Sequence, residues 1–248
     1  MKRYLFEIVF NGKNYHGWQI QQNAITVQQL IDQAIKVLIP NLLEINIVGC
    51  GRTDKGVHAE QFFFHVDLPL ILNAHNFKFK LNQILPSDIV IENCLPVSDD
   101  FHARFSAISR TYEYRIISQK NPFLEDFSTL ITHDLDIEVM NICASLLKDY
   151  QDFKSFSKVQ TAVNNFNCNI VDAKWYKLEK QLVFSISANR FLRNMVRAIV
   201  GTILMVGKKN IEVEEFAKII EARNRSLAGV SVPAKGLFLT KVEYPNYE

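Results

Sequence analysis

The sequence predicts an α+β protein in which two similar halves follow one another along the chain. Apolar residues recur at a spacing of two in some segments and of three to four in others, typical of strands and helices respectively. The two segment types alternate in a similar order in each half of the 248 residues. A chain of this length can bury two cores. We place the N-terminal half at residues 1–100 and the C-terminal half at 101–248.

The N-terminal half is expected to begin with a strand at about 3–10, because alternate residues there are apolar and share one face. Those residues are Tyr4, Phe6, Ile8 and Phe10. A helix should follow from Val27 to about Leu38, with Thr26 as its N-cap and apolar residues every third or fourth position. Pro40 ends that pattern.

Four further elements complete this half. We expect a strand at about 45–50, a strand at about 59–67, a helix at about 73–84 that begins at Asn73, and a strand at about 89–97. The resulting order, β-α-β-β-α-β, is that of a ferredoxin-like or RRM-like unit.

The C-terminal half follows the same pattern less regularly. Its predicted strands lie at about 108–118, 166–178, 181–188 and 237–244, and its predicted helices at about 136–150, 190–206 and 211–223. Two such halves predict antiparallel sheets joined edge to edge, with the helices on one face and an active-site cleft on the other.

Composition and motifs exclude several classes of protein. The acidic Glu7 comes before any long apolar stretch, and no apolar run approaches the length that spans a bilayer, so we expect a cytoplasmic protein without membrane association. The four cysteines and six histidines show no zinc spacing, and we expect buried thiols and no metal. No glycine-rich phosphate-binding motif occurs, so no nucleotide cofactor is expected.

The most informative segment is Cys50-Gly-Arg-Thr-Asp-Lys-Gly-Val-His-Ala59. It places the carboxylate of Asp54 between the cations Arg52 and Lys55, and nearby opposite charges favour the ionised carboxylate. An ionised carboxylate is suited to attack and not to donate a proton. A hairpin turn is the alternative interpretation of these residues, and from Thr-Asp-Lys-Gly alone it is the favoured one.

Two further segments carry arginines in suggestive patterns. Strand 108–118 should present Arg110 and Tyr112 on one face, a combination that can stack a base and neutralise its phosphate, although a sheet with aromatic cross-strand pairs fits equally well. In the predicted helix 190–206, arginines at spacings of three and four form a stripe, which is more often a solvated face. The stripe consists of Arg190, Arg193 and Arg197. Arg197 lies among apolar residues and should need an acidic partner.

A third segment, Tyr15-His-Gly-Trp-Gln-Ile-Gln-Gln22, combines aromatic rings with amide side chains. Such groups can stack on bases and read their edges. Core packing of Tyr15 and Trp18 is an equal alternative, and the sequence leaves the choice open.

Taken together, these segments resemble the tRNA pseudouridine synthase A family over nearly the whole chain. The matching landmarks begin at Asn11-Gly-Lys-Asn-Tyr-His-Gly-Trp-Gln19, Gly51-Arg-Thr-Asp-Lys-Gly-Val-His-Ala59, Phe101-His-Ala-Arg-Phe-Ser-Ala107 and Arg110-Thr-Tyr-Glu-Tyr114. They continue with Asp152-Phe-Lys-Ser-Phe156, Asn189-Arg-Phe-Leu-Arg-Asn-Met-Val-Arg-Ala-Ile-Val-Gly201 and Pro233-Ala-Lys-Gly-Leu-Phe-Leu239.

The resemblance implies that a homodimer converts uridine to pseudouridine in the anticodon stem-loop of tRNA, at positions 38, 39 and 40, without cofactor or metal. It implies that Asp54 is the nucleophile and that Arg52 and Arg197 act beside it. Tyr112 and Leu237 would contact the target uridine. The remaining substrate-binding candidates are Arg110, Gln19 and Arg193.

Two alternatives remain open at this point. A non-catalytic RNA-binding protein or tRNA chaperone would fit the arginine and tyrosine pattern, but a carboxylate such as Asp54 opposes phosphate binding. A glycosidase-like hydrolase would ordinarily need a second carboxyl group, and the segment 50–59 around Asp54 offers none.

Overall fold

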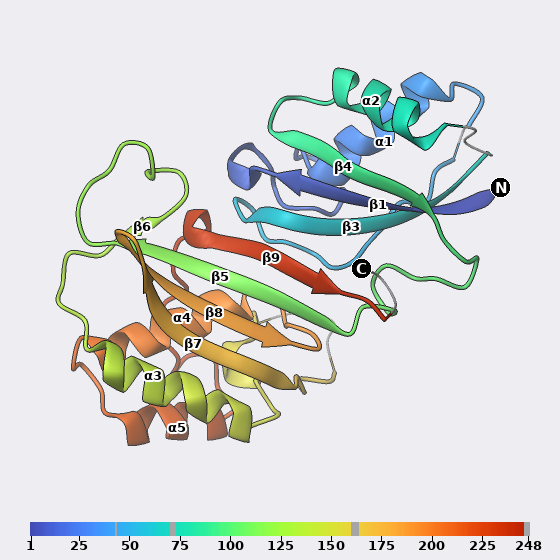
Figure 1. Ribbon diagram of the computed structural model, residues 1–248. Helices are drawn as coiled ribbons and strands as arrows, with labels where there is room; N and C mark the ends of the chain where they lie inside the picture. Colours follow the sequence, from blue (N-terminus) through green and yellow to red (C-terminus); the bar gives the residue numbers. More distant parts are fainter. Residues whose placement is uncertain (43, 70–72, 160–163, 246–248) are drawn as a thin grey trace. The chain divides into compact units, whose positions relative to one another are not determined.

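The computed structural model describes residues 1–42, 44–69, 73–159 and 164–245. The chain divides into two compact units (Figure 1). The first unit contains Met1–Ile108 together with the end of the chain from Leu239, and the second contains Ser109–Phe238. The final strand, β9 (Leu237–Glu243), crosses this division, so the last part of the chain belongs with the N-terminal unit.

The strands of the first unit are β1 (Lys2–Phe10), β2 (Val48–Gly49), β3 (His58–Leu68) and β4 (Ile89–Pro96). β1 lies between β4 and β3 and pairs antiparallel with both, while β2 pairs antiparallel with β3. β9 follows β3 in the strand order. The predicted elements of this half are confirmed except that the strand expected at about 45–50 is reduced to the two residues of β2.

Both helices of the first unit begin where the sequence predicts. The Thr26 side chain accepts a hydrogen bond from the Gln29 N–H and caps α1 (Val27–Leu38), and Asn73 caps α2 (Ala74–Ile84) through the Asn76 N–H. Capping side chains replace backbone partners that the first turn of a helix lacks. Figure 1 shows both helices on the same side of β1, β3 and β4.

Aromatic rings fill the core between these helices and the sheet. The predicted apolar face of β1 is buried, and Phe6 stacks on Phe64 of β3 with ring centroids 4.8 Å apart. Trp18 packs on Phe62 at 4.3 Å. Such pairs add roughly 0.5–1.5 kcal/mol each beyond the burial of their surface. The core interpretation of Trp18 and Tyr15 is therefore confirmed, since they are 1% and 4% exposed.

The second unit contains β5 (Ser109–Ile117), β6 (Thr129–Leu130), β7 (Ile170–Leu178) and β8 (Gln181–Ala188). β8 lies between β5 and β7 and pairs antiparallel with both, whereas the short β6 pairs parallel with β5. Its helices are α3 (Ile137–Leu146), α4 (Met195–Gly207) and α5 (Val213–Glu221), which pack against one another. Figure 1 shows them on one side of this sheet.

One predicted helix in this unit is wrong at its start. The helix expected at 190–206 begins at Met195, so Arg190 and Arg193 lie in the segment before it and form no helical stripe with Arg197. The cause is Asn194, whose φ of +66° places it in the left-handed region, where Asn is tolerated but a helix cannot continue. The strand expected from residue 166 begins at Ile170, and residues 160–163 lie outside the described residues.

The four cysteines are buried, free thiols, as expected. Burial raises the pKa of Cys94 to about 12 and the pKa values of Cys143 and Cys168 to about 11. Among the residues that the structure describes, no helix is long and apolar enough to cross a membrane.

Candidate active site

Asp54 opens a tight turn in the long connection between β2 and β3. The Val57 N–H donates to the Asp54 carbonyl at 3.2 Å, and Gly56 occupies the third position of the turn with φ of +77°. A positive φ only at that position defines a type II turn, which favours glycine. Thus the turn that the sequence predicts does form. It is not the tip of a two-residue hairpin, because Gly49 already pairs with Phe64.

The segment that follows β1 forms hydrogen bonds with this turn and with the start of β3. The Gly56 N–H donates to the Tyr15 carbonyl at 3.1 Å, and the Gly12 N–H donates to Nδ1 of His58 at 3.1 Å. These bonds join two segments about forty positions apart in the sequence. We call residues 50–57 the Asp54 loop and residues 11–19 the supporting segment.

Two glycines allow the supporting segment to approach so closely. A Cβ atom at Gly17 would lie 2.1 Å from the Thr53 carbonyl oxygen, and one at Gly12 would lie 1.9 Å from the Val57 carbonyl oxygen. Gly17 also has φ of +84°. Sequence reasoning did not identify these glycines as determinants of the site, although both fall within the first family landmark. Backbone contact on both sides fixes the path of the Asp54 loop.

The charged side chains of the Asp54 loop reach the surface to different extents. Arg52 and Lys55 are exposed, whereas Asp54 is half-buried. Thr53, between Arg52 and Asp54, is buried. The loop therefore buries Thr53 and carries the Asp54 carboxylate between two accessible cations in the sequence. The prediction that Asp54 is the nucleophile depends on this arrangement.

Gln19, a predicted substrate contact, takes part in an internal amide network. Its Nε2 donates to Oε1 of Gln28 at 2.9 Å, and that oxygen also accepts the Ile20 N–H. Gln28 in turn donates to the Ile47 carbonyl at 2.8 Å and is buried. In this structure the half-buried Gln19 amide holds the end of the supporting segment, and its contact with substrate stays a prediction.

In the second unit, Arg110 and Tyr112 lie half-buried on β5. Nη1 of Arg110 donates to the Asn189 carbonyl at 2.8 Å, and the Tyr112 ring meets the Phe191 ring edge-on at 5.1 Å. Tyr114, two residues further along β5, is fully buried. The strand thus combines a core tyrosine with an accessible one.

Tyr114 connects β5 to the start of β9. Its hydroxyl hydrogen-bonds to Oγ1 of Thr129 at 2.6 Å and donates to the Pro233 carbonyl at 2.9 Å, and burial raises its pKa. A Cβ at Gly236 would lie 2.9 Å from the Tyr114 ring. These contacts fix the residues that lead into Leu237, which is 5% exposed. Leu237 is therefore a firmly placed apolar group.

Arg197 lies in the first turn of α4 and is half-buried. Its Nε donates to the Val232 carbonyl at 2.7 Å, and the Val232 N–H donates back to the Arg197 carbonyl at 3.2 Å. The guanidinium is thus oriented by a backbone group. The acidic partner predicted for it, Asp54, belongs to the other unit, and that pairing stays a prediction.

The segment 228–232, which receives Arg197, is itself held by side chains that sequence reasoning missed. Nη1 of Arg225 donates to the Ala228 and Gly229 carbonyls at 3.2 and 3.1 Å, and its Nη2 donates to Oγ of Ser231 at 2.9 Å. Asn194 donates to the same Ser231 oxygen. Such contacts between separate segments produce no periodic pattern in the sequence, so sequence reasoning could not find them.

Arg193 lies exposed in the segment before α4. Its carbonyl accepts the Lys158 N–H at 3.0 Å. No cluster of three or more histidine, cysteine, aspartate or glutamate side chains that could hold a metal ion occurs in the described part of the chain.

These features define a class of protein: an α+β protein with an anchored carboxylate and several positioned arginines. In a comparison with known proteins, residues 146–245 match the family model described as tRNA pseudouridine synthase. The chain is 47% identical to tRNA pseudouridine synthase A of Porphyromonas gingivalis over 99% of its own length and 98% of the relative.

Two further relatives agree. The chain is 44% identical to tRNA pseudouridine synthase A of Azobacteroides pseudotrichonymphae, covering 100% of this chain and 98% of that protein. It is 44% identical to the protein of that name in Bacteroides thetaiotaomicron, covering 99% and 91%. The chain belongs to the tRNA pseudouridine synthase A family, whose members are isomerases acting on tRNA, and the predicted family and enzyme class are confirmed.

Proposed function

We propose that this protein isomerises uridine to pseudouridine at positions 38, 39 and 40 of the anticodon stem-loop of tRNA, with Asp54 as the nucleophile. The single observation that carries the assignment to Asp54 is the fixed Asp54 loop. Two glycines and three backbone N–H groups fix the backbone of this loop, which carries the half-buried Asp54 between the exposed residues Arg52 and Lys55. A reacting group must be held in position by its surroundings, and this loop has such surroundings.

The reaction needs few groups because it is an internal rearrangement. The bond between C1′ of the ribose and N1 of the uracil breaks, the base turns, and a bond forms between C1′ and C5. The C5 proton leaves to solvent and N1 ends with a proton, so no electrons are gained or lost overall. The carboxylate of Asp54 can attack either the sugar or the base to carry the intermediate.

The remaining residues have supporting roles in this proposal. Arg197 supplies the cation that keeps Asp54 ionised once water is excluded. Tyr112 stacks on the uracil and Leu237 gives an apolar wall. Arg52 holds the position that the base vacates or grips the neighbouring backbone, because a stacked base must first be exposed, at a cost of a few kcal/mol.

Further substrate contacts are assigned to Arg110, Gln19 and Arg193, whose cationic and amide groups suit phosphate oxygens and base edges. The proposal takes both units as RRM-like halves with the active site on the sheet face away from the helices. The pairing of β4 with β1, of β1 with β3 and of β3 with the short β2 supports an RRM-like arrangement for the first unit. A homodimer, which the family resemblance implies, and a cytoplasmic location, which the apolar pattern of the sequence predicts, also belong to the proposal.

Release of tritium from tRNA labelled at C5 of uridine tests the function directly. The wild-type protein should release tritium from positions 38–40, and Asp54→Asn should lower the rate at least about 1,000-fold, as loss of a nucleophile does. Gly51→Ala is the matched control in the same loop, since a Cβ at Gly51 would meet nothing within 4 Å. Native Trp18 fluorescence in both variants shows whether the fold is retained.

The outcomes separate the alternatives. An Asp54→Asn protein that folds, binds tRNA and still forms pseudouridine would remove Asp54 as the nucleophile. Tight binding of tRNA with no turnover by the wild-type protein would favour the RNA-binding alternative, and free uracil among the products would favour the hydrolase.

A further inference from the structure

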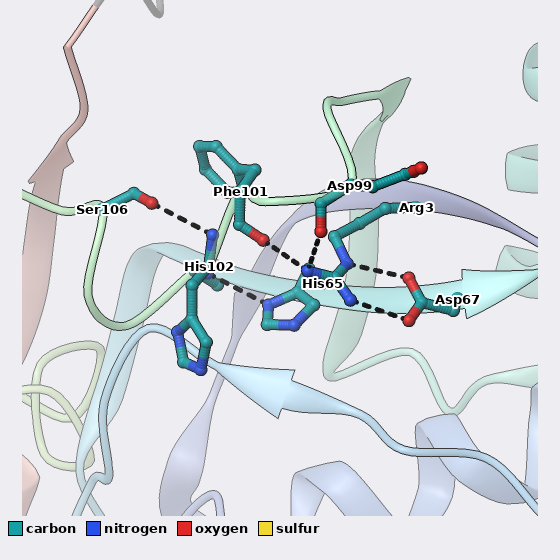
Figure 2. Close-up of polar contacts among 8 residues, drawn as sticks. Arg3, His65, Asp67, Asp99, Phe101, His102 and Ser106 are labelled. Atoms are coloured by element: carbon teal, nitrogen blue, oxygen red, sulfur yellow. Dashed lines mark hydrogen bonds and ion pairs between the residues drawn. The ribbon is translucent and has the colours of Figure 1, made fainter.

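Residues 98–106, between β4 and β5, form a rigid loop on the first unit. Arg3 of β1 fastens one end of it, because Nη1 donates to the carbonyls of Asp99 and Phe101 (Figure 2). The same guanidinium donates through Nε and Nη2 to the two carboxylate oxygens of Asp67, each at 2.8 Å. A planar guanidinium with both edges occupied has little freedom to turn.

Four more hydrogen bonds hold the other end of the loop. The Ala103 N–H donates to Nδ1 of His65 on β3 at 3.0 Å, and the Tyr244 hydroxyl donates to the Ala103 carbonyl at 2.7 Å. The His102 N–H donates to Oγ of Ser106 at 3.0 Å, and the Ser106 N–H donates to the His102 carbonyl at 2.8 Å (Figure 2). The backbone that carries the rings of this loop is therefore held in place before a partner arrives.

Three rings in this region form a row that runs from the interior to the surface. His65 is 4% exposed and its ring lies 4.9 Å from that of His102. The His102 ring lies 4.3 Å from the Phe105 ring, with the two planes 33° apart. Phe105 ends the row and is 75% exposed. A large aromatic ring that is accessible on a fixed loop offers one face to another planar group, which can stack on it.

One cation, Arg104, lies at the exposed end of this row, whereas Asp99 and Asp100 lie near Arg3 at the other end of the loop. The Arg104 guanidinium lies 5.5 Å from the centre of the Phe105 ring. Burial, and then the positive charge of Arg3, lower the pKa of His65 to about 4, and burial also lowers the pKa of His102. Both imidazoles are therefore neutral near pH 7 and receive backbone N–H groups at Nδ1. The acidic Asp99 lies at the opposite end of the loop, beside Arg3 (Figure 2).

We propose that Phe105 and Arg104 form a docking platform for RNA, in which an unpaired base of the tRNA stacks on the Phe105 ring and Arg104 contacts the adjoining phosphate. The inference rests on the proposed function and adds a substrate contact to it. An aromatic ring beside an arginine is the combination by which proteins bind unpaired nucleotides. A second copy of the chain is the competing occupant, but a protein interface calls for a broad apolar patch and not a single ring beside a cation.

Binding of an unmodified tRNA transcript to four variants of the full chain tests the platform. We expect Phe105→Ala and Phe105→Leu each to weaken binding about 10-fold, and Phe105→Trp to retain it, since stacking needs an aromatic face. Arg104→Gln should lower the slope of log affinity against log salt by about one. Phe79→Ala is the matched control, because Phe79 on α2 is also exposed, at 57%, and should leave binding unchanged.

Kinetics and mass distinguish the possible outcomes. In the tritium-release assay, Phe105→Ala should raise KM about 10-fold and leave kcat unchanged, as loss of a binding contact does. Equal affinity for Phe105→Ala and wild type, or equal loss for Phe79→Ala, would overturn the platform. A change in the oligomeric state of Phe105→Ala in solution would assign the ring to an interface between copies of the chain and would also overturn the platform. Tritium release by the wild-type protein tests the proposed function, and its result does not depend on whether Phe105 contacts the tRNA.

Discussion

Acidification from pH 7 to pH 4 should destabilise the first unit, and the larger contribution should come from His65, beside a smaller one of the same sign from His102. The ring is buried and accepts the Ala103 N–H at Nδ1, so its neutral form is the one that the fold accommodates. Protonation would place a charge near Arg3 and remove that acceptor. Burial therefore lowers the pKa of His65 from 6.5 to about 4.

The sign and size of the effect follow from this difference. Between pH 6.5 and pH 4 the unfolded chain binds a proton at His65 that the folded chain does not, so the free energy of unfolding falls as pH falls. At about 1.4 kcal/mol per pH unit, the loss reaches about 3 kcal/mol at pH 4. The Asp67 carboxyl, whose pKa the hydrogen-bonded Arg3 lowers below 3.8, loses its stabilising effect only in more acidic solution.

Urea unfolding at pH 7.0, 6.0, 5.0 and 4.5 measures the effect. The chain has two tryptophans, one in each unit, so a Trp175→Phe background leaves Trp18 as the reporter of the first unit. His65→Asn can still accept the Ala103 N–H through its amide oxygen but does not titrate. We expect its stability to approach and then exceed that of the parent as pH falls. His75→Asn, at an exposed histidine, is the matched control.

Parallel stability curves for the parent and His65→Asn would refute this reasoning. So would an NMR titration in which the His65 ring changes protonation near pH 6.5, since the ring would then gain nothing from remaining neutral in the fold.

Three further predictions concern the groups that position the site. Gly17→Ala should lower both the free energy of unfolding and the rate of tritium release, because its Cβ would meet the Thr53 carbonyl oxygen at 2.1 Å. The loss of stability should exceed the roughly 1 kcal/mol that an alanine in the left-handed region costs. Gly51→Ala, measured alongside it, should change neither quantity. Gly201→Ala should destabilise the second unit more than Gly207→Ala in thermal unfolding. The Cβ of the first variant would meet the Val230 carbonyl oxygen at 1.9 Å, whereas the Cβ of the second would meet Sδ of the Met140 side chain at 2.4 Å, and a side chain can shift more easily than backbone. Arg225→Lys should lower kcat with little change in KM, because it loosens segment 228–232, whose Val232 carbonyl orients the Arg197 guanidinium. An unchanged kcat would show that Arg225 is not a positioning residue.

Elements with local signals could be predicted from the amino-acid sequence alone. The apolar alternation of residues 3–10 and the caps Thr26 and Asn73 predicted β1, α1 and α2 within one residue of their observed ends. Periodicity and capping depend only on neighbours in the chain, so they can be read without the fold. The landmark segments likewise identified the family and the Asp54 motif, because a motif is a property of consecutive residues.

Features that depend on contacts between distant residues became visible in the folded chain alone. The start of α4 was misjudged because Asn194 adopts a left-handed backbone that apolar periodicity does not report. The roles of Gly12 and Gly17 became visible only when their backbones were seen against the Asp54 loop. The neutral state of His65 depends on burial beneath a loop from a different part of the sequence. Close approach and desolvation are created by folding, so no local pattern encodes them directly.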